Sequence, residues 1–425
     1  MTQASSENIK ENFVFNYTMF IFDSVGFGSA FALLIPLSYS PDVAFEISGE
    51  WFAAPSVIII FYFLNIFGQF ISSSNRKKEE DSKFDVIKWG IFERLGFVLI
   101  FMTLKFFIES ELILYLFLIA YAIFVYSSGA ILPAYFDLVS RLLYKHRAIF
   151  FAANLTTGSL AGFLVSRFVD FRIKETGLIN GFLDGLLMVI VITTISLIPL
   201  ILIREPKSIN KLKSNLTIEL INKKLEDWYK IFTNSKDIRT IARANVVSVI
   251  PESITPFFTI WLITFYSENS NKIGFWVTLL LVSQSIGSFI VPIIASKLGF
   301  KTTYIFGLIF HFIASSLFLL NPLIFQNLIF IFAGFGSGSF VTSLSNISVE
   351  IGKVGDAGNT NALLTAFRLP GLLIGPFLFA YFVNLENITF FLICSLISSL
   401  FGILIMYFQQ KNIILPQIRF WSKDS

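Results

Sequence analysis

Twelve apolar stretches, each long enough to cross a bilayer as a helix, run along this chain between Asn12 and Gln410. One crossing takes about 20 apolar residues, because the hydrocarbon core is about 30 Å thick and a helix rises about 1.5 Å per residue. Lipid offers the backbone no hydrogen-bond partners, so each stretch must be helical. The sequence therefore predicts an all-α membrane protein with spans at 13–38, 51–73, 90–108, 112–138, 148–168, 181–203, 241–266, 274–295, 303–320, 324–348, 359–383 and 388–408.

The composition excludes an ordinary soluble domain. Of the 425 residues, 55% are hydrophobic and 14% are charged, and the apolar residues come in long runs rather than at amphipathic spacing. A single cysteine, Cys394, and two histidines provide neither a disulfide framework nor a Cys/His metal site. The net charge of +4 comes from bases in the loops, where it indicates membrane topology, so we expect no nucleic-acid partner.

The distribution of lysine and arginine predicts the orientation. Most of the 32 basic residues lie in loops on the same side as both termini, and the densest run extends from Arg204 to Arg243. The loop from Pro41 to Glu50, on the opposite side, carries three acids and no base. Because positively charged loops stay on the cytoplasmic side, we predict that both termini are cytoplasmic. We also expect a monomeric, multi-pass protein of the plasma or inner membrane.

The only long hydrophilic interruption divides the chain into halves. Residues 1–203 hold six spans, 204–240 form a cytoplasmic linker, and 241–425 hold six further spans and a short tail. An amphipathic piece around Leu216 to Phe232 is expected to lie along the membrane surface. Similar residues recur in the two halves in chain order, which predicts parallel six-helix repeats. The matches are Asn16, Asp23 and Ser24 with Asn245, Glu252 and Ser253, Gly68 with Gly287, Gly129 with Gly338, and Gly158 and Gly162 with Gly371 and Gly375.

Several motifs carry a family resemblance. Six plus six helices with a long cytoplasmic middle loop resemble the major facilitator superfamily of secondary transporters, over almost the whole chain. The segment SGAILPAYFDLV at 128–139, running into HRAIFF at 146–151, looks like the connection between helices four and five in a poorly characterised bacterial subgroup. LIREP at 202–206 and ERL at 93–95 look like further marks of that subgroup. The superfamily's signature between helices two and three is degenerate here, with its bases kept at 76–78 and its glycine and aspartate missing.

The resemblance implies two pseudo-symmetric six-helix bundles that rock about a central cavity. In this fold, helices 1, 4, 7 and 10 line the cavity, helices 2, 5, 8 and 11 form the interface between halves, and helices 3, 6, 9 and 12 face lipid. Alternating access then exposes a midplane site to each side in turn.

Two carboxylates are placed where such a site would lie. Asp23 and Glu252 each lie about ten residues into a span that starts inside, which is about 15 Å or half the hydrocarbon thickness. A carboxylate at this depth costs about 2.5 to 3.5 kcal/mol, and burial disfavours its charged form, which suits reversible protonation. The alternative interpretation is a fixed ion pair with Arg368. Arg368 lies about as deep in span eleven and needs either one of these acids or an anionic substrate as its partner.

Helix-breaking residues flank both acids. Pro251 and Pro256 bracket Glu252, and Gly26 and Gly28 follow Asp23. Backbone carbonyls freed by a broken helix at this depth could coordinate an ion or a substrate, whereas a simple kink would have no functional role.

Other polar residues are assigned by position. Arg94 and Asp137 map to cytoplasmic helix ends, where they could be inner-gate residues or ordinary interfacial charges. Arg141 and Arg147 are possible partners for Asp137. Six uncharged or aromatic residues are candidate substrate contacts that could equally bridge helices. They are Asn16, Tyr126, Asn154, Asn245, Trp261 and Gln284.

The sequence predicts a secondary active transporter and no enzyme. We expect protonation of Asp23 or Glu252 to couple to movement of a small organic solute, with H⁺ or Na⁺ as the coupling ion and no cofactor or metal. The competing class is a membrane-embedded enzyme, which would need a nucleophile with a base, a His-rich metal site or a large headgroup-facing domain. A third class is a lipid-handling or sensor protein on a transporter-like scaffold. The mostly apolar, aromatic cavity expected here favours an amphiphilic or neutral solute.

Overall fold

The computed structural model describes residues 12–74, 82–143, 147–205, 218–264, 266, 268, 272–351, 357–381 and 385–408. The basic loop at 76–78, residues 206–217 of the linker and the C-terminal tail lie outside the described residues, as does the side chain of Arg147. Nearly all of the described chain is helical, as expected where the backbone must satisfy its own hydrogen bonds.

The first half contains seven described helices. They are α2 (Phe13–Leu34), α3 (Ser40–Ser48), α4 (Ala53–Ser74), α5 (Ser82–Phe106), α6 (Ile113–Leu142), α7 (Arg147–Thr176) and α8 (Leu178–Leu202). The short α3 occupies the predicted acidic outside loop, so that loop is folded rather than extended.

The linker and the second half contain ten described helices, of which several are short. They are α9 (Ile218–Asn234), α10 (Lys236–Ser248), α11 (Ile250–Ile254), α12 (Phe257–Thr264), α13 (Ile273–Leu298), α14 (Phe300–Leu320), α15 (Pro322–Ile351), α16 (Ala357–Ala366), α17 (Leu369–Tyr381) and α18 (Leu385–Phe408).

Within the described ranges, eleven helical stretches are long and apolar enough to cross a membrane. The predicted span absent from this set is α5, whose apolar stretch contains Glu93, Arg94 and Lys105. With 25 residues α5 is still long enough to cross, and it packs along α6 and α8 as the other spans do. Its charges exclude it from the set, although its length and packing match those of the spans.

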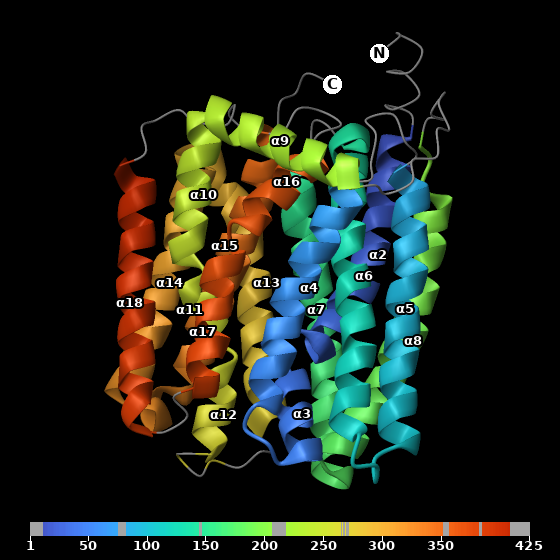
Figure 1. The fold of residues 1–425 in the computed structure, drawn as a ribbon, viewed down its shortest axis with the longest axis vertical. Helices are drawn as coiled ribbons and strands as arrows, with labels where there is room; N and C mark the ends of the chain where they lie inside the picture. Colours follow the sequence, from blue (N-terminus) through green and yellow to red (C-terminus); the bar gives the residue numbers. More distant parts are fainter. Residues whose placement is uncertain are drawn as a thin grey trace.

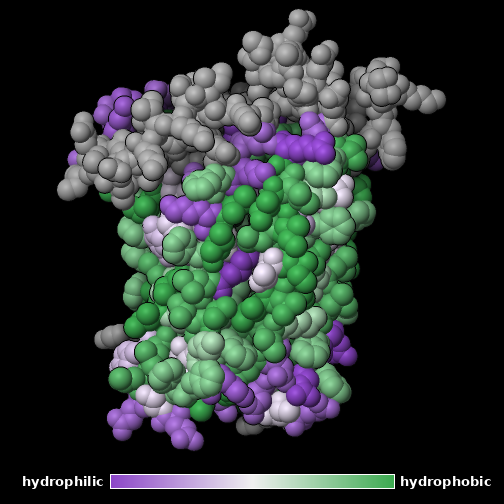
Figure 2. Space-filling model, turned by 90° about the vertical axis from the view of Figure 1, so that its right-hand side faces the viewer, coloured by the Kyte–Doolittle hydropathy of each residue, from purple (hydrophilic) through white to green (hydrophobic). Residues whose placement is uncertain are grey.

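The spans stand side by side in one bundle (Figure 1). Helix α9 lies across one end, which we call the inner end, and α3 lies at the other, which we call the outer end. A hydrophobic belt separates hydrophilic rims at the two ends, and a small hydrophilic patch interrupts the belt on the side formed by α5 and α8 (Figure 2). This surface confirms a multi-span membrane protein.

The second half has broken helices where the sequence places prolines. Helices α10, α11 and α12 together make one span, with interruptions ahead of Pro251 and Pro256. Helices α16 and α17 make another, interrupted at Phe367 and Arg368 ahead of Pro370. Proline has no backbone N–H to donate and clashes with the preceding turn, which accounts for both sets of breaks.

Helix α2, by contrast, is continuous, so the expectation that Gly26 and Gly28 break it is wrong. A Cβ atom on Gly26 would lie 2.0 Å from Ser196 Oγ, and one on Gly28 would lie 1.9 Å from the carbonyl oxygen of Gly158. These glycines therefore let α8 and α7 pack closely against α2.

Glycines at repeated positions make equivalent contacts in the two halves. Each allows a neighbouring helix to approach at the matching carbonyl, which supports the internal repeat read from the sequence. A Cβ added to Gly68 would lie 2.4 Å from the carbonyl oxygen of Tyr126, and one added to its repeat partner Gly287 would lie 2.9 Å from that of Phe335. A Cβ added to Gly129 would lie 2.1 Å from the carbonyl oxygen of Asn65, and one added to its repeat partner Gly338 would lie 2.2 Å from that of Gln284.

The repeat shifts by one helical turn in the fifth span. A Cβ on Gly158 would lie 3.1 Å from the oxygen of Ser24, and one on Gly375 would lie 2.7 Å from that of Ser253, the repeat partner of Ser24. Gly375, rather than Gly371, is therefore the counterpart of Gly158.

Candidate functional site

A cavity of about 300 Å³ lies between the two halves. Helices α2, α6, α11 and α15 line it, in agreement with the roles expected of spans 1, 4, 7 and 10. Helices α5 and α8 line it as well, through Gly90, Arg94 and Thr193 among others, so the expectation that spans 3 and 6 face only lipid is wrong. The volume matches a site for one small organic molecule.

Asp23 lies near the middle of α2 and lines the cavity. Among the described residues it makes no hydrogen bond or ion pair, although the charges of Arg94 and Glu93 act on it. An acid at this depth without a fixed partner is a candidate functional group.

Arg94 lies at the middle of α5 rather than at its cytoplasmic end, so its assignment to an inner gate is corrected. The helix starts at Ser82, eight residues before the predicted span, and this moves Arg94 to midplane depth. Its guanidinium forms an ion pair of 3.2 Å with Glu93 and donates over 2.8 Å to the carbonyl oxygens of Gly90 and Thr193. These bonds fix the arginine between α5 and α8.

Glu252 and Arg368 form the second charged pair of the cavity wall, 2.5 Å apart. Both lie at helix breaks, Glu252 on the five-residue α11 and Arg368 between α16 and α17. The guanidinium also lies over the ring of Phe340, 5.3 Å from its centroid. Of the two partners left open by the sequence, an acid or an anionic substrate, the structure places the acid against Arg368.

The charges of the cavity wall are therefore unequally compensated. Glu93 faces Arg94 and Glu252 faces Arg368, each within ion-pair distance. Asp23 is the carboxylate left over in the described lining, and it is the group that a proton or another monovalent cation would neutralise.

Two of the six candidate substrate contacts line the cavity, Asn154 and Gln284. The amide of Asn154 donates to the hydroxyl of Tyr135 over 2.9 Å, so α6 and α7 are linked at the cavity wall. The side chains of α6 and α7 thus present a preformed hydrogen-bonding edge.

The other four candidate contacts lie elsewhere. Asn16 donates to and accepts from the backbone of Arg204 and so holds the end of α8. Asn245 forms hydrogen bonds with the backbone of Leu364 and the hydroxyl of Tyr304. Trp261 is fully buried among phenylalanines. Tyr126 packs against Phe67 and Trp89 outside the cavity. None of these four side chains lines the cavity, and all of them bridge or pack helices instead.

The two halves contact each other at the inner end of the cavity. Asp137 accepts a hydrogen bond of 2.7 Å from the backbone N–H of Gly358, at the start of α16. A Cβ on Gly358 would lie 2.0 Å from the carbonyl oxygen of Pro133, so only glycine allows this approach of α16 to α6. Asp137 therefore lies at the inner end of the cavity, where a backbone N–H of the second half is one of its partners.

Helix α9 reinforces this contact as a strap across both halves. Trp228 packs on Phe70 of α4, with ring centroids 5.1 Å apart, and donates to Asn359 of α16 over 2.6 Å. Lys224 donates to the carbonyl oxygen of Ser73, and α9 lies across the inner end of the bundle (Figure 1). This placement agrees with the surface helix predicted for the linker.

Arg141 has a role within the first half. It pairs with Glu205 over 2.6 Å and donates to Ser82, while the backbone N–H of Lys83 donates to the same carboxylate. This cluster joins the inner ends of α5, α6 and α8 and gives the LIREP motif a structural role. The predicted partnership of Asp137 with Arg147 falls on a side chain outside the described residues.

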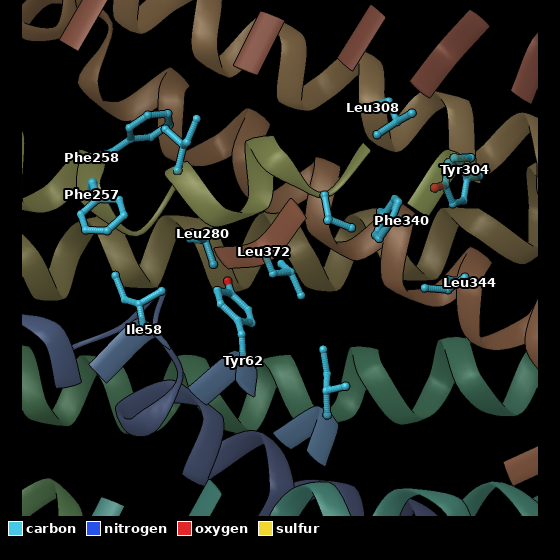
Figure 3. Close-up of a cluster of buried hydrophobic side chains, with 14 of the residues drawn as sticks. Ile58, Tyr62, Phe257, Phe258, Leu280, Tyr304, Leu308, Phe340, Leu344 and Leu372 are labelled. Atoms are coloured by element: carbon cyan, nitrogen blue, oxygen red, sulfur yellow. The ribbon is translucent and has the colours of Figure 1, made fainter. Parts of the chain in front are cut away.

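The halves also contact each other toward the outer end. Ser166 of α7 donates to the backbone of Gly274 over 3.3 Å and lies 3.3 Å from the hydroxyl of Thr278 on α13. Ile58 and Tyr62 of α4 pack into the hydrophobic cluster of the second half near Leu280 and Leu372 (Figure 3). The cavity therefore lies between contacts at both of its ends.

Several cavity residues were not singled out from the sequence, notably Glu93, Tyr62, Ser337 and Thr342. The adjacent charges Glu93 and Arg94 inside an apolar stretch were a signal, hidden by a span predicted to begin too late. The hydroxyl residues gave no signal, because serine and threonine are common on packed membrane helices.

No protein-family model and no curated protein matches this sequence. Solved structures do match over nearly the whole chain. A D-xylose–proton symporter aligns with a TM-score of 0.69 at 13% identity, covering 96% of this chain and 99% of the other. The human organic anion transporter MFSD10 aligns with a TM-score of 0.68 at 12% identity, covering 94% of this chain and 99% of the other. The E. coli fucose:proton symporter aligns with a TM-score of 0.63 at 12% identity, covering 95% of this chain and 99% of the other. This chain is a multi-pass membrane protein with the fold of the major facilitator superfamily.

Proposed function

We propose that this protein is a secondary active transporter that moves a small organic solute by alternating access, coupled to protons through Asp23. The observation that carries the proposal is a cavity between two repeat-related halves, with one carboxylate that has no fixed partner in its described wall. Two of the structures with this fold are described as proton symporters, which is consistent with the coupling ion.

The inner and outer contacts supply the two closures that alternating access requires. Rocking the halves apart at Asp137 and Gly358 would open the cavity to the cytoplasm, while the seam at Ser166 and Thr278 stays closed. The reverse motion would open it outward. Both closures rest on a few hydrogen bonds and close backbone contacts, which a change at the cavity can offset.

Protonation of Asp23 supplies that change. A charged Asp23 is tolerable while water fills the cavity, but becomes costly when the halves close over it. Binding a proton removes the charge and allows the closed state to form. The pairs Glu93–Arg94 and Glu252–Arg368 remain neutral overall throughout, so the cavity changes its net charge only at Asp23.

The test is solute-dependent proton flux into proteoliposomes that contain a pH-sensitive dye. Neutral, cationic and anionic organic solutes are presented to the wild type and to Asp23→Asn under an imposed pH gradient. We expect Asp23→Asn to lose proton-driven uptake by at least about a hundredfold, which corresponds to a loss of about 2.8 kcal/mol of coupling free energy. Exchange of solute without a gradient should persist in this variant.

Asp42→Asn is the matched control. Asp42 is also a buried aspartate of the first half without a hydrogen-bond partner for its Oδ2, but it lies outside the cavity. It should keep proton-driven uptake. Full coupling in Asp23→Asn, or equal loss in both variants, would contradict the assignment of the proton to Asp23.

A further inference from the structure

The two walls of the cavity differ in chemistry. Seven aromatic side chains line it, and all seven belong to the first half, including Phe27 and Phe31 on α2 and Phe136 and Phe151 on α6 and α7. The rings of Phe136 and Phe151 stack 5.3 Å apart. The first half therefore presents broad apolar faces to a bound molecule.

The wall from the second half has no aromatic ring among its described lining residues. Hydroxyl, amide and charged groups make up most of it, and its apolar members are aliphatic. Leu344 and Leu372 are two of these, and Leu372 lies opposite Tyr62 of the first half (Figure 3). The ring of Phe340 lies behind Arg368 rather than in the cavity lining.

Three polar groups of this second wall are buried without a hydrogen-bond partner. They are Ser337 Oγ, Thr342 Oγ1 and Arg368 Nε, and the two hydroxyl residues are 5% and 1% exposed. Elsewhere in the bundle a buried hydroxyl usually donates to its own helix, as Ser343 does to Ser339 on the same α15. A polar group buried without a partner in this environment costs about 1 to 3 kcal/mol, so these three groups point to a bound partner.

The cavity charges limit what that partner can be. Glu252 and Glu93 lie within ion-pair distance of Arg368 and Arg94 and compensate their charges, so the cavity wall offers an anion no uncompensated positive charge. The remaining carboxylate, Asp23, is assigned to the proton under the proposed function. An uncharged molecule fits this arrangement without leaving a charge unpaired.

We infer that the substrate is an uncharged, oxygen-bearing amphiphile with a flat apolar body. Its body lies against the aromatic wall of the first half, and its oxygen end bonds to Ser337, Thr342 and the free N–H of Arg368 on the second. This inference rests on the proposed function for the existence of a substrate. The inference adds the chemical class of the substrate and its orientation between the two walls of the cavity.

The test compares probes that share one skeleton. Binding of 2-naphthol, naphthalene and naphthalene-2-sulfonate to the protein in lipid nanodiscs is measured by equilibrium dialysis, at a mildly acidic pH where 2-naphthol is neutral. Empty nanodiscs correct for partition into lipid. We expect 2-naphthol to bind about two- to tenfold more tightly than naphthalene, the factor that one net hydrogen bond provides, and the sulfonate to bind most weakly.

A double variant and a matched control assign the preference to the hydroxyl wall. Ser337→Ala with Thr342→Val keeps the shape of the wall and should remove the preference for 2-naphthol while leaving naphthalene binding unchanged. Ser348→Ala removes another buried hydroxyl of α15 that has no partner but lies outside the cavity, and it should keep the preference. Phe136→Leu should weaken the binding of 2-naphthol and naphthalene together.

The outcomes separate this inference from the proposed function. The dialysis measurement imposes no proton gradient, so its result does not depend on proton coupling at Asp23. Tightest binding of the sulfonate, an undiminished preference in the double variant, or no binding of any probe would each overturn the substrate class. Proton coupling at Asp23 would still stand or fall by the flux measurement alone.

Discussion

The two halves share a repeat but treat their buried acids differently. In the second half every acidic side chain that the structure describes has a partner, and Glu252 is held by Arg368 at 2.5 Å. The first half has a partly buried Asp23 in the cavity wall and a buried Asp42 at the outer end, and neither carboxylate has a partner among the described residues. The repeat partners Asp23 and Glu252 thus occupy corresponding positions with opposite environments.

Helix breaks account for the difference. Prolines interrupt the seventh and eleventh spans of the second half, and the interruptions place Glu252 and Arg368 against each other. In the first half α2 and α7 are unbroken and pack through Gly28 and Gly158, and no described basic side chain of α7 lies within ion-pair distance of Asp23. One half therefore holds a fixed pair, and the other keeps a carboxylate that can titrate.

The largest expected effect comes from breaking the fixed pair. Glu252→Gln leaves Arg368 as an uncompensated buried cation, and such changes cost about 3 to 5 kcal/mol in proteins. We expect a strong loss of thermal stability in detergent, measured by intrinsic tryptophan fluorescence.

The control is the double variant Glu252→Gln with Arg368→Met, which removes both charges. It should recover most of the lost stability, because replacing a buried pair by neutral groups is often close to neutral. Equal instability of the single and double variants would show that packing rather than charge decides the site. By comparison Asp23→Asn, which breaks no pair, should leave stability nearly unchanged.

A smaller effect should separate two glycines at repeated positions. A Cβ on Gly68 would lie 2.4 Å from the carbonyl oxygen of Tyr126, whereas one on Gly287 would lie 2.9 Å from that of Phe335. Overpacking of this kind costs about 1 to 3 kcal/mol. Gly68→Ala should therefore lower the melting temperature more than Gly287→Ala in the same detergent.

Gly49→Ala is a reference for the glycine pair, since Gly49 has open space around it but a backbone φ of 66°. Its cost is one of conformation rather than packing. If Gly287→Ala lowered the melting temperature more than Gly68→Ala, the first half would not be the more tightly packed at this contact.

A pH-dependent effect is expected from the other unpartnered acid. Burial raises the pKa of Asp42 from 3.8 to about 8. The folded state therefore holds a proton that the unfolded state has lost, and stability falls as the pH rises from about 4 to about 8.

Asp42→Asn removes this dependence. Melting temperatures measured from pH 4 to pH 8 should decline less steeply in the variant than in the wild type, with the two proteins closest at the acidic limit. A steeper decline in the variant would mean that Asp42 is charged in the folded protein.

Much of the architecture could be predicted from the sequence, and part of the site could not. The spans and the surface helix follow from hydropathy along the chain and the repeat from residues that recur in the same order, and the structure agrees on them apart from the charges of α5. Depth along a span was also predictable, as it was for Asp23 and Glu252. It failed for Arg94, because charges at the start of α5 concealed eight residues of helix.

The side of each helix that faces the cavity could not be predicted in the same way. Asn154 and Gln284 line the cavity while Asn16 and Asn245 tie helices together, although all four are amides on spans of the cavity or the interface. A membrane helix is apolar on most of its surface, so its hydropathy pattern does not reveal which side meets the other half.

The sequence by itself determined the number of spans, their division into two related halves and the depth of the central acids, since these depend on distance along the chain. Only the tertiary structure decided that Arg368 pairs with Glu252, that Asp23 has no fixed partner and that the aromatic and hydroxyl walls face each other. These contacts join residues more than a hundred positions apart, and the breaks and rotations of several packed helices bring them together.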